Sequence, residues 1–277
     1  EWDLDGDDIY GETGADAARG DETGMQPTFS AVGLVGPDTV TVGLRVTDAL
    51  GAVSTDTATI TITTKAIISG LEATALQYTE NQTAATLCPA LVVADADSAT
   101  LANATIRISA NYHSGEDVLS AETAGTSLTA TFDSATGVLT VSGTGTLAEY
   151  QQVLRTLSYR NTSENPATAP RTVTFQANDG TQDGNSLSRQ ITITAVNDAP
   201  AAEAGGPHTV RQGGSGPLDG SLSTDPEQGY TTLVYEWDLD GDDIYGETGA
   251  DAARGDETGM QPTFSAVGLV GPDTVTV

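Results

Sequence analysis

Apolar and polar residues alternate along most of this chain, which is the pattern of half-buried β-strands. Residues 40–46 carry valine or leucine at every second position, and residues 57–63 alternate threonine with alanine or isoleucine. In residues 233–240, leucines and aromatic rings fall on one face and acids on the other. We expect strands in these three segments and in six more, at 104–110, 127–132, 138–141, 155–159, 172–177 and 190–195.

One segment departs from this alternation and has helical spacing instead. Leu147, Tyr150, Val153, Leu154 and Leu157 recur at intervals of three or four, which predicts a short helix. Elsewhere Asp-Gly and Ser-Gly turns separate the predicted strands at the spacing of β-sandwiches. The predicted fold class is all-β, with tandem β-sandwiches and one short helix.

The end of the chain repeats its beginning. Residues 236–277 are identical to residues 1–42, so the repeat period is 235 residues and must contain whole domains. Two linkers, at 63–66 and 195–200, divide this period. We therefore predict an incomplete domain at 1–64 without its N-terminal strands, a complete domain at 66–198, and an incomplete domain at 201–277 without its C-terminal strands.

The charge of the chain restricts its partners. Ten Lys and Arg residues face 39 Asp and Glu residues, which leaves a formal net charge of −29. Such a surface repels nucleic acid and attracts cations, so we expect no nucleic-acid partner. No run of about 20 apolar residues exists, and we expect no membrane insertion in this segment. The single Cys88 cannot form an internal disulfide and is expected to be a small buried hydrophobe.

A group of acids follows the tryptophan of each repeat. Asp3, Asp5, Asp7 and Asp8 alternate with Leu and Gly, and Glu12 follows. Carboxylates so close together repel one another unless a hard cation such as Ca²⁺ lies among them. The spacing begins like an EF-hand loop and then departs from it. We predict a calcium site, with a solvated acidic turn as the alternative. The second copy carries the same residues: Asp238, Asp240, Asp242, Asp243 and Glu247.

Residues 201–277 together with 43–64 resemble the PKD domain, an Ig-like sandwich. The motifs are G-P-x-x-V-x-x-G at 206–213, S-x-D-P at 223–226, Y-x-W-D at 235–238 and V-x-D-x-x-G at 46–51. The resemblance implies that these residues form one sandwich of about 100 residues.

The middle domain resembles the cadherin-like repeats of giant bacterial surface proteins. The motifs are YTEN at 78–81, DADS at 95–98, AND at 177–179 and AVNDAP at 195–200. The resemblance implies calcium between modules, where a shared ion stiffens a flexible joint. The alternative is that the residues before Pro200 only form a turn. The ligands implied by this resemblance are Glu80, Asp95, Asp97, Asp179, Asn197 and Asp198.

The motifs of enzymes are weak in this chain. G-x-G-x-x-A at 143–148 follows an alternating strand and no βαβ series follows it, which is not the setting of a dinucleotide site. His113 and His208 do not have zinc-ligand spacing. We therefore expect that the chain is not an enzyme.

These observations predict a structural repeat segment of a long, calcium-stiffened adhesin or surface fibre, secreted by a bacterium to the cell surface. Its expected partners are adjacent repeats or copies of itself, with a cell-surface or glycan ligand. Two alternatives stay open. The chain can be a filament or sheath subunit that assembles by strand complementation, or a carbohydrate-binding accessory region of a secreted enzyme.

Overall fold

The computed structural model describes residues 1–271 and 274–276. The chain divides into two compact units: Glu1–Tyr78, Gln82–Asn161 and Ala169–Thr192 in the first, and Thr79–Asn81, Thr162–Thr168 and Ile193–Val277 in the second. The described residues are all-β except for one short helix, which confirms the predicted class. The boundaries of the three predicted modules stay a prediction, and Val277, at the end of the third, lies outside the described residues.

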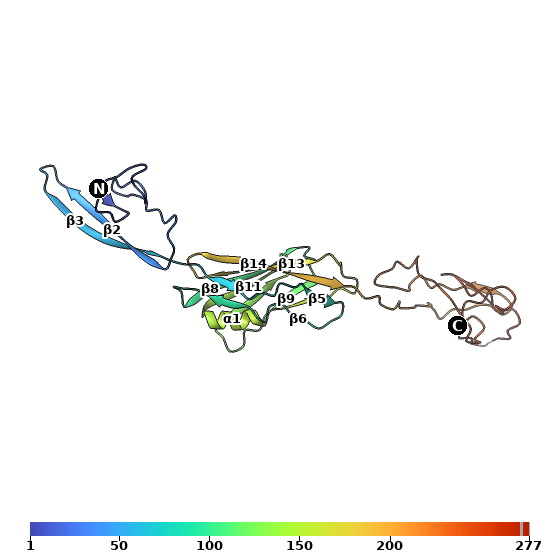
Figure 1. Ribbon diagram of the computed structural model, residues 1–277. Helices are drawn as coiled ribbons and strands as arrows, with labels where there is room; N and C mark the ends of the chain where they lie inside the picture. The colour runs from blue at the N-terminus through green and yellow to red at the C-terminus, as the bar shows by residue number, and fades with distance from the viewer. Residues whose placement is uncertain (272–273, 277) are drawn as a thin grey trace. The chain divides into compact units, whose positions relative to one another are not determined.

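A long hairpin dominates the first 64 residues (Figure 1). Strands β1 (Trp2–Asp3), β2 (Asp38–Thr47) and β3 (Val53–Ile62) form an antiparallel sheet in that order. The predicted strands at 40–46 and 57–63 are confirmed. Their apolar face is covered at Val42 and Ile62, whereas Val46 and Ala58 are exposed.

The middle of the chain contains a six-stranded sheet with the order β10-β11-β8-β13-β14-β5. Beside it lie a three-stranded sheet, β6-β12-β9, and a two-stranded sheet, β4-β7. The long strands confirm the predicted alternation. Their bounds are β4 Ile67–Ser69, β5 Leu76–Thr79, β6 Ala85–Thr86, β7 Val92–Ala94, β8 Thr100–Ala110, β9 Asp117–Ser120, β10 Thr129–Asp133, β11 Val138–Thr146, β12 Ser158–Asn161, β13 Arg171–Asn178 and β14 Asp183–Thr194.

The predicted helix is α1 (Leu147–Arg155), which contacts β7, β8 and β11 (Figure 1). Thr146 and Glu149 form a capping box, in which each side chain accepts a backbone N–H of the other. The predicted strand at 155–159 is wrong in its first half. Arg155 still belongs to the helix, because the helical pattern of apolar residues continues through it, and the strand begins at Ser158.

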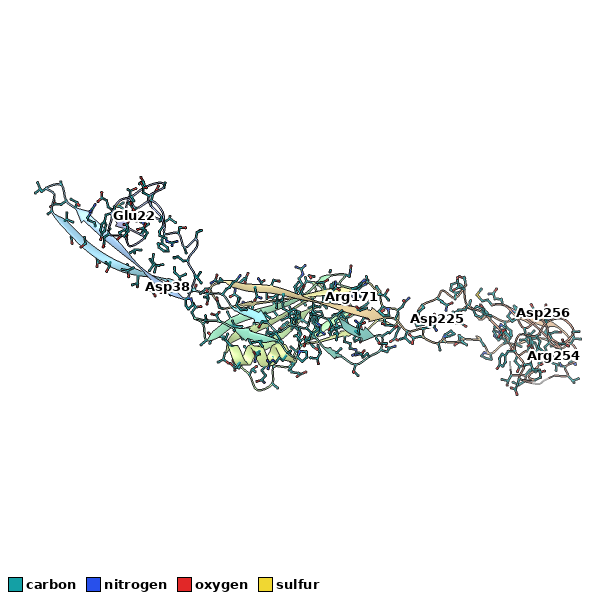
Figure 2. All side chains as sticks on the ribbon, in the orientation of Figure 1. Glu22, Asp38, Arg171, Asp225, Arg254 and Asp256 are labelled. Atoms are coloured by element: carbon teal, nitrogen blue, oxygen red, sulfur yellow. The ribbon has the colours of Figure 1, made fainter. Side chains whose placement is uncertain are left out.

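The core of the first unit contains a buried ion pair. The Arg171 Nε donates to Asp117 Oδ2 at 3.0 Å, and both side chains are fully buried (Figure 2). Tyr159 and Asn161 donate to the other oxygen of Asp117, at 2.6 and 2.8 Å. Burial raises the pKa of the Tyr159 hydroxyl, so it stays a donor. Cys88 is buried as predicted, and burial raises its pKa to about 12.

The second unit contains a smaller sheet of β15 (Ser215–Pro217) and β16 (Thr263–Ser265). The predicted strand at 233–240 is wrong: the described residues there form an isolated bridge between Glu236 and Thr258. Asp238, on the acidic face of this segment, is buried, and its carboxylate accepts N–H bonds from the following loop. The core of this unit consists of Leu218, Trp237, Leu239, Phe264 and Ala266.

Candidate metal centres

The acidic loop after β1 is folded by its own carboxylates and by left-handed residues. The Asp3 side chain accepts N–H bonds from Gly6 at 2.6 Å and from Asp8 at 3.1 Å. Gly6 and Asp8 have φ values of 79° and 69°, a region that Gly adopts freely and Asp tolerates. These turns hold the chain in a tight loop, so the acids at alternate positions meet.

Two groups of three carboxylates form in this loop, and they share Asp5. The first contains Asp3, Asp5 and Glu22, and the second contains Asp5, Asp7 and Glu12, with ligand oxygens within 4.8 Å of one another in each group. Glu22 is fully buried and accepts the N–H of Leu4 at 2.6 Å (Figure 2). Asp8 lies in neither group. Its backbone N–H donates to the Asp3 carboxylate and so helps to form the turn.

The electrostatics of the loop favour a cation. Asp5 Oδ1 and Glu12 Oε2 are buried and accept no hydrogen bond from the described residues. Burial raises the pKa of Glu12, and the negative charges of Asp7 and Asp5 raise it further. Buried carboxylate oxygens without donors cost free energy unless a proton or a cation compensates them.

The second copy reproduces this arrangement. Its groups are Asp238, Asp240 and Glu257, and Asp240, Asp242 and Glu247. The pKa of Glu247 is raised by burial, as in the first copy, and Asp240 Oδ1 and Glu247 Oε2 again lack partners among the described residues. Asp243 repeats the left-handed conformation of Asp8, with φ of 68°. The same local sequence therefore gives the same acidic loop twice.

A separate group lies at the AVNDAP linker, within the second unit. Glu80, Asp198 and Glu227 place oxygens within 4.8 Å of one another. Glu80 Oε2 accepts the N–H of Val196 at 2.7 Å, and Glu227 Oε2 accepts the N–H of Asp198 at 3.3 Å. One oxygen of each acid, namely Glu80 Oε1, Asp198 Oδ2 and Glu227 Oε1, is buried without a hydrogen-bond partner in the described residues.

Burial also raises the pKa of Glu227, to which the charges of Asp198 and Asp225 contribute. Glu80 itself is 5% exposed, so its carboxylate is mostly cut off from water. Carboxylate oxygens gathered in this way are the type of ligand that a hard cation such as Ca²⁺ takes, and the three acids would supply part of its set of about 6–8 oxygens. The residues present therefore fit the ion that the cadherin-like resemblance implies.

The remaining predicted ligands lie at the other linker, within the first unit. Asp97 accepts the N–H of Thr64 at 3.0 Å and is paired with the Thr64 hydroxyl, which lowers the pKa of Asp97. Asp179 accepts N–H bonds from Thr181 and Gln182. Among the described residues, Asp95, Asp97 and Asp179 form no group of three acids with oxygens in ligand range. Hydroxyl and amide donors occupy the carboxylates of Asp97 and Asp179, whereas Asp95 Oδ2 is buried without a hydrogen-bond partner among the described residues.

The structure thus sorts the predicted ligands. It brings together the four acids of the loop, Asp3, Asp5, Asp7 and Glu12, and it brings Glu80 together with Asp198. The exposed Asn197 lies outside the second group, and its side chain donates to the carbonyl of Asp198. Sequence reasoning missed Glu22, Glu257 and Glu227. Glu227 follows Asp225 in the S-x-D-P turn, and this pairing of acids in a turn beside the linker was the available signal.

No family model matches the chain. The chain is 31% identical over 167 residues to Halomucin from Haloquadratum walsbyi, a match that covers 56% of this chain and 2% of Halomucin. It therefore spans a small fraction of the curated relative. No helix among the described residues is long and apolar enough to cross a membrane.

Two solved structures show weak similarity. Domains 4–9 of the surface layer protein SbsC match with a TM-score of 0.21 and 12% identity, over 86% of this chain and 31% of that one. Extracellular cadherin domains 3–6 of protocadherin gamma B2 match with a TM-score of 0.25 and 15% identity, over 87% and 53%. At these TM-scores the similarities carry no argument about function.

Proposed function

We propose that this chain is a structural repeat segment of a long extracellular adhesin or surface fibre, in which Ca²⁺ fixes the joints between β-sandwich modules. The role is mechanical and includes no catalytic step. Its partners are neighbouring repeats or copies of the chain, and its location is the cell surface.

The group of Glu80, Asp198 and Glu227 carries this proposal. Glu80 belongs to the YTEN motif at the start of the middle module, Asp198 to the linker and Glu227 to the module that follows. An ion bound by all three would tie both modules to the linker, and it would supply the positive charge that their unpaired oxygens need. Without it, mutual repulsion of the acids would loosen the joint.

The long repeat period and the similarity to Halomucin support a place in a large repetitive surface protein. Halomucin is archaeal, so the expected bacterial source stays a prediction, as does the PKD-like resemblance. The sugar-binding alternative gains no support from Trp237, because its indole is buried and donates to the Gly259 carbonyl at 2.9 Å.

Calorimetric titration of the chelator-stripped chain with Ca²⁺ tests the proposal. We expect binding below millimolar concentration, and we expect Glu80→Gln to remove one class of site while the loop sites keep theirs. Glu122→Gln is the matched control, because Glu122 is exposed and lies outside every acidic group. An isotherm that Glu80→Gln leaves unchanged would contradict the joint site, and absence of binding in the unsubstituted chain would contradict the whole proposal.

A further inference from the structure

Three segments of the chain carry the N-x-[ST] pattern, which marks asparagine side chains that receive a sugar chain in secreted proteins. They are residues 81–83 (Asn-Gln-Thr), 103–105 (Asn-Ala-Thr) and 161–163 (Asn-Thr-Ser). So short a pattern also arises by chance, and the sequence alone selects none of the three. The structure separates them, because an acceptor must reach an enzyme and must leave room for a sugar.

Asn161 is closed to such a reaction in the folded chain. It is 4% exposed, and its Nδ2 donates to Asp117 Oδ1 at 2.8 Å. The Tyr159 hydroxyl donates to the same oxygen, and Arg171 pairs with the other one. A sugar on the Asn161 amide would have to break this buried network, whose polar groups are costly to leave without partners.

Asn103 lies in the middle of the six-stranded sheet. On β8 it is opposite Ser142 of β11 on one side and Asn178 of β13 on the other. Ala104, the central residue of its pattern, is fully buried. To present this segment to an enzyme as a loop, the sheet would have to give up backbone hydrogen bonds on both edges of β8.

Asn81 has the setting that the other two lack. It lies in residues 80–84, which connect β5 to β6 (Figure 1). Asn81, Gln82 and Thr83 are all exposed. The φ value of Asn81 is 61°, in the left-handed region that Asn adopts more readily than most residues. The chain therefore turns sharply at Asn81, and the whole pattern lies at the surface.

Contacts on both sides of Asn81 hold this turn in place. The Glu80 N–H donates to the Thr194 carbonyl at 2.9 Å. The Tyr78 hydroxyl, on a fully buried side chain, donates to the Gln82 carbonyl at 2.8 Å. The turn thus presents its acceptor in a fixed position and needs no local unfolding to expose it.

A sugar at this position is compatible with the neighbouring contacts. The Asn81 Nδ2 donates to Glu164 Oε2 at 2.9 Å on the surface. A carboxamide nitrogen carries two hydrogens, and a glycosylated one retains one, so this bond can persist. Glu80 is buried, with its carboxylate in the group with Asp198 and Glu227, so the modification would leave those acids unchanged.

We propose that Asn81 is the acceptor of an N-linked oligosaccharide, a proposal that rests on the cell-surface location proposed above. The donor is a lipid-linked oligosaccharide, and the catalyst is an oligosaccharyltransferase that recognises the Thr83 hydroxyl. The Asn81 Nδ2 forms a bond to the anomeric carbon of the sugar as the bond from that carbon to the lipid phosphate breaks. The phosphate leaves with the electron pair, and one amide proton passes to a base, so no oxidant or reductant is needed.

Enzymatic transfer to the folded chain tests this proposal. The full chain, made in cells without an N-glycosylation pathway, is incubated with a purified oligosaccharyltransferase that accepts N-x-[ST] and with a lipid-linked oligosaccharide. We expect one oligosaccharide per chain, which glycopeptide mapping assigns to Asn81. Asn81→Gln and Thr83→Ala should abolish transfer, and Thr83→Ser should retain it. Thr83→Ala is the decisive variant, because it keeps Asn81 in the left-handed turn.

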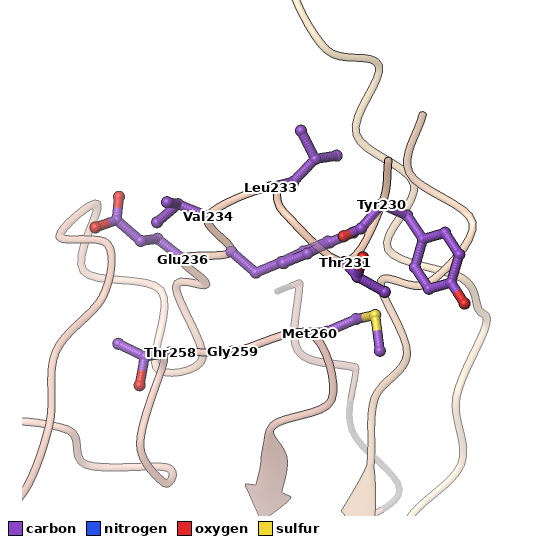
Figure 3. Close-up of a pocket in the computed structure, with 9 residues that line it drawn as sticks. Tyr230, Thr231, Leu233, Val234, Glu236, Thr258, Gly259 and Met260 are labelled. Carbon is purple, nitrogen blue, oxygen red and sulfur yellow. The ribbon is translucent and has the colours of Figure 1, made fainter. Parts of the chain in front are cut away.

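The masses are measured on the unfolded chain, so that only covalent sugar counts. An open cavity of about 540 Å³ lies between residues 230–236 and 258–260, and the Tyr230 ring borders it (Figure 3). An oligosaccharide held there without a bond would be lost on unfolding, whereas one on Asn81 would remain.

Thr105→Ala is the matched control, because it removes the same hydroxyl from the pattern at Asn103 and should leave transfer unchanged. A short N-x-[ST] peptide in the same reaction verifies that the transferase is active. No transfer to the folded chain while the peptide is modified, transfer to Asn103 or Asn161 instead, or undiminished transfer to Thr83→Ala would each overturn the proposal. An unmodified Asn81 in the chain recovered from the surface of its own cells would also overturn it.

Calcium titration separates this proposal from the joint site. Asn81 and Thr83 lie outside every acidic group, so Thr83→Ala should keep the calcium isotherm of the unsubstituted chain. A chain that accepts the oligosaccharide but binds no calcium would contradict the joint site alone. A chain that binds calcium but accepts no oligosaccharide would contradict the proposal for Asn81 alone.

Discussion

At single residues, burial and neighbouring negative charges raise the pKa of several glutamates and so make their ionisation less favourable. Burial raises the pKa of Glu12 and Glu247 above the ordinary value of 4.5, and neighbouring aspartates reinforce the shift. A group whose folded-state pKa is raised stabilises the fold fully below its ordinary pKa. That contribution is lost as the pH rises through the raised pKa, because the folded protein then loses a proton that it had retained.

In chelator, the contribution of Glu12 and Glu247 to stability should therefore fall as the pH rises from about 4.5 through their raised pKa values. Relative to the unsubstituted chain, the double variant Glu12→Gln/Glu247→Gln should therefore gain stability as the pH rises through this range. The comparison cancels groups with lowered pKa, such as Asp133, which contribute with the opposite sign and are kept in both proteins. Melting temperature as a function of pH measures the slopes.

Calcium should reverse the trend, since its ligands must be deprotonated and binding then strengthens as the pH rises. Equal slopes in the two proteins would mean that these carboxyl groups are solvated and not held together.

At the level of strands, the middle domain depends on the ion pair between β9 and β13. Arg171→Met would leave the Asp117 carboxylate buried without its cation, which typically costs about 3–5 kcal/mol in the free energy of unfolding. Urea denaturation measures the loss. Arg160→Met is the control: Arg160 is exposed on β12, and such surface changes usually stay within about 0.5 kcal/mol. A similar small effect of Arg171→Met would show that the pair is not needed for the fold.

The strands and the helix could be predicted because their signals are local. Alternation identified β8, β11 and β13, and helical spacing identified α1, since each pattern lies within a dozen residues. The boundary at Arg155 was missed because the apolar residues of the helix run directly into the next strand. The strand at 233–240 was overpredicted because alternation does not reveal whether a partner strand is present. In the first copy the matching residues Trp2–Asp3 pair with β2, whereas the described residues at 233–240 form only the bridge between Glu236 and Thr258.

The acidic loop was predicted for the same reason, whereas its most deeply buried acid, Glu22, was not. Asp3, Asp5 and Asp7 are neighbours in the sequence, so their convergence needs one turn only. Glu22 reaches the site from the far end of the loop, and Glu227 reaches Glu80 across 147 residues. Such contacts depend on how strands and linkers fold back, which spacing along the chain does not encode.

Over the whole molecule, the excess of Asp and Glu over Lys and Arg makes the negatively charged side chains repel one another. A net charge of −29 on 277 residues destabilises compact states, and salt screens it as the Debye length falls from about 10 Å at 0.1 M to about 3 Å at 1 M. We expect the melting temperature in chelator to rise with NaCl over this range. Screening acts on all charges, so this rise should not depend on the identity of the monovalent salt.

Calcium should act differently, because the unpaired oxygens at Asp5, Glu12 and Glu80 need a directly bound cation and not screening. At ionic strength matched with NaCl, CaCl₂ should raise the melting temperature further, and MgCl₂ should do so less, since Mg²⁺ gives up its water reluctantly. Glu80→Gln should reduce the calcium increment and leave the NaCl slope intact. If CaCl₂ and NaCl at equal ionic strength gave the same melting temperatures, the acids would be solvated surface groups, and calcium would not stabilise the joints of this repeat.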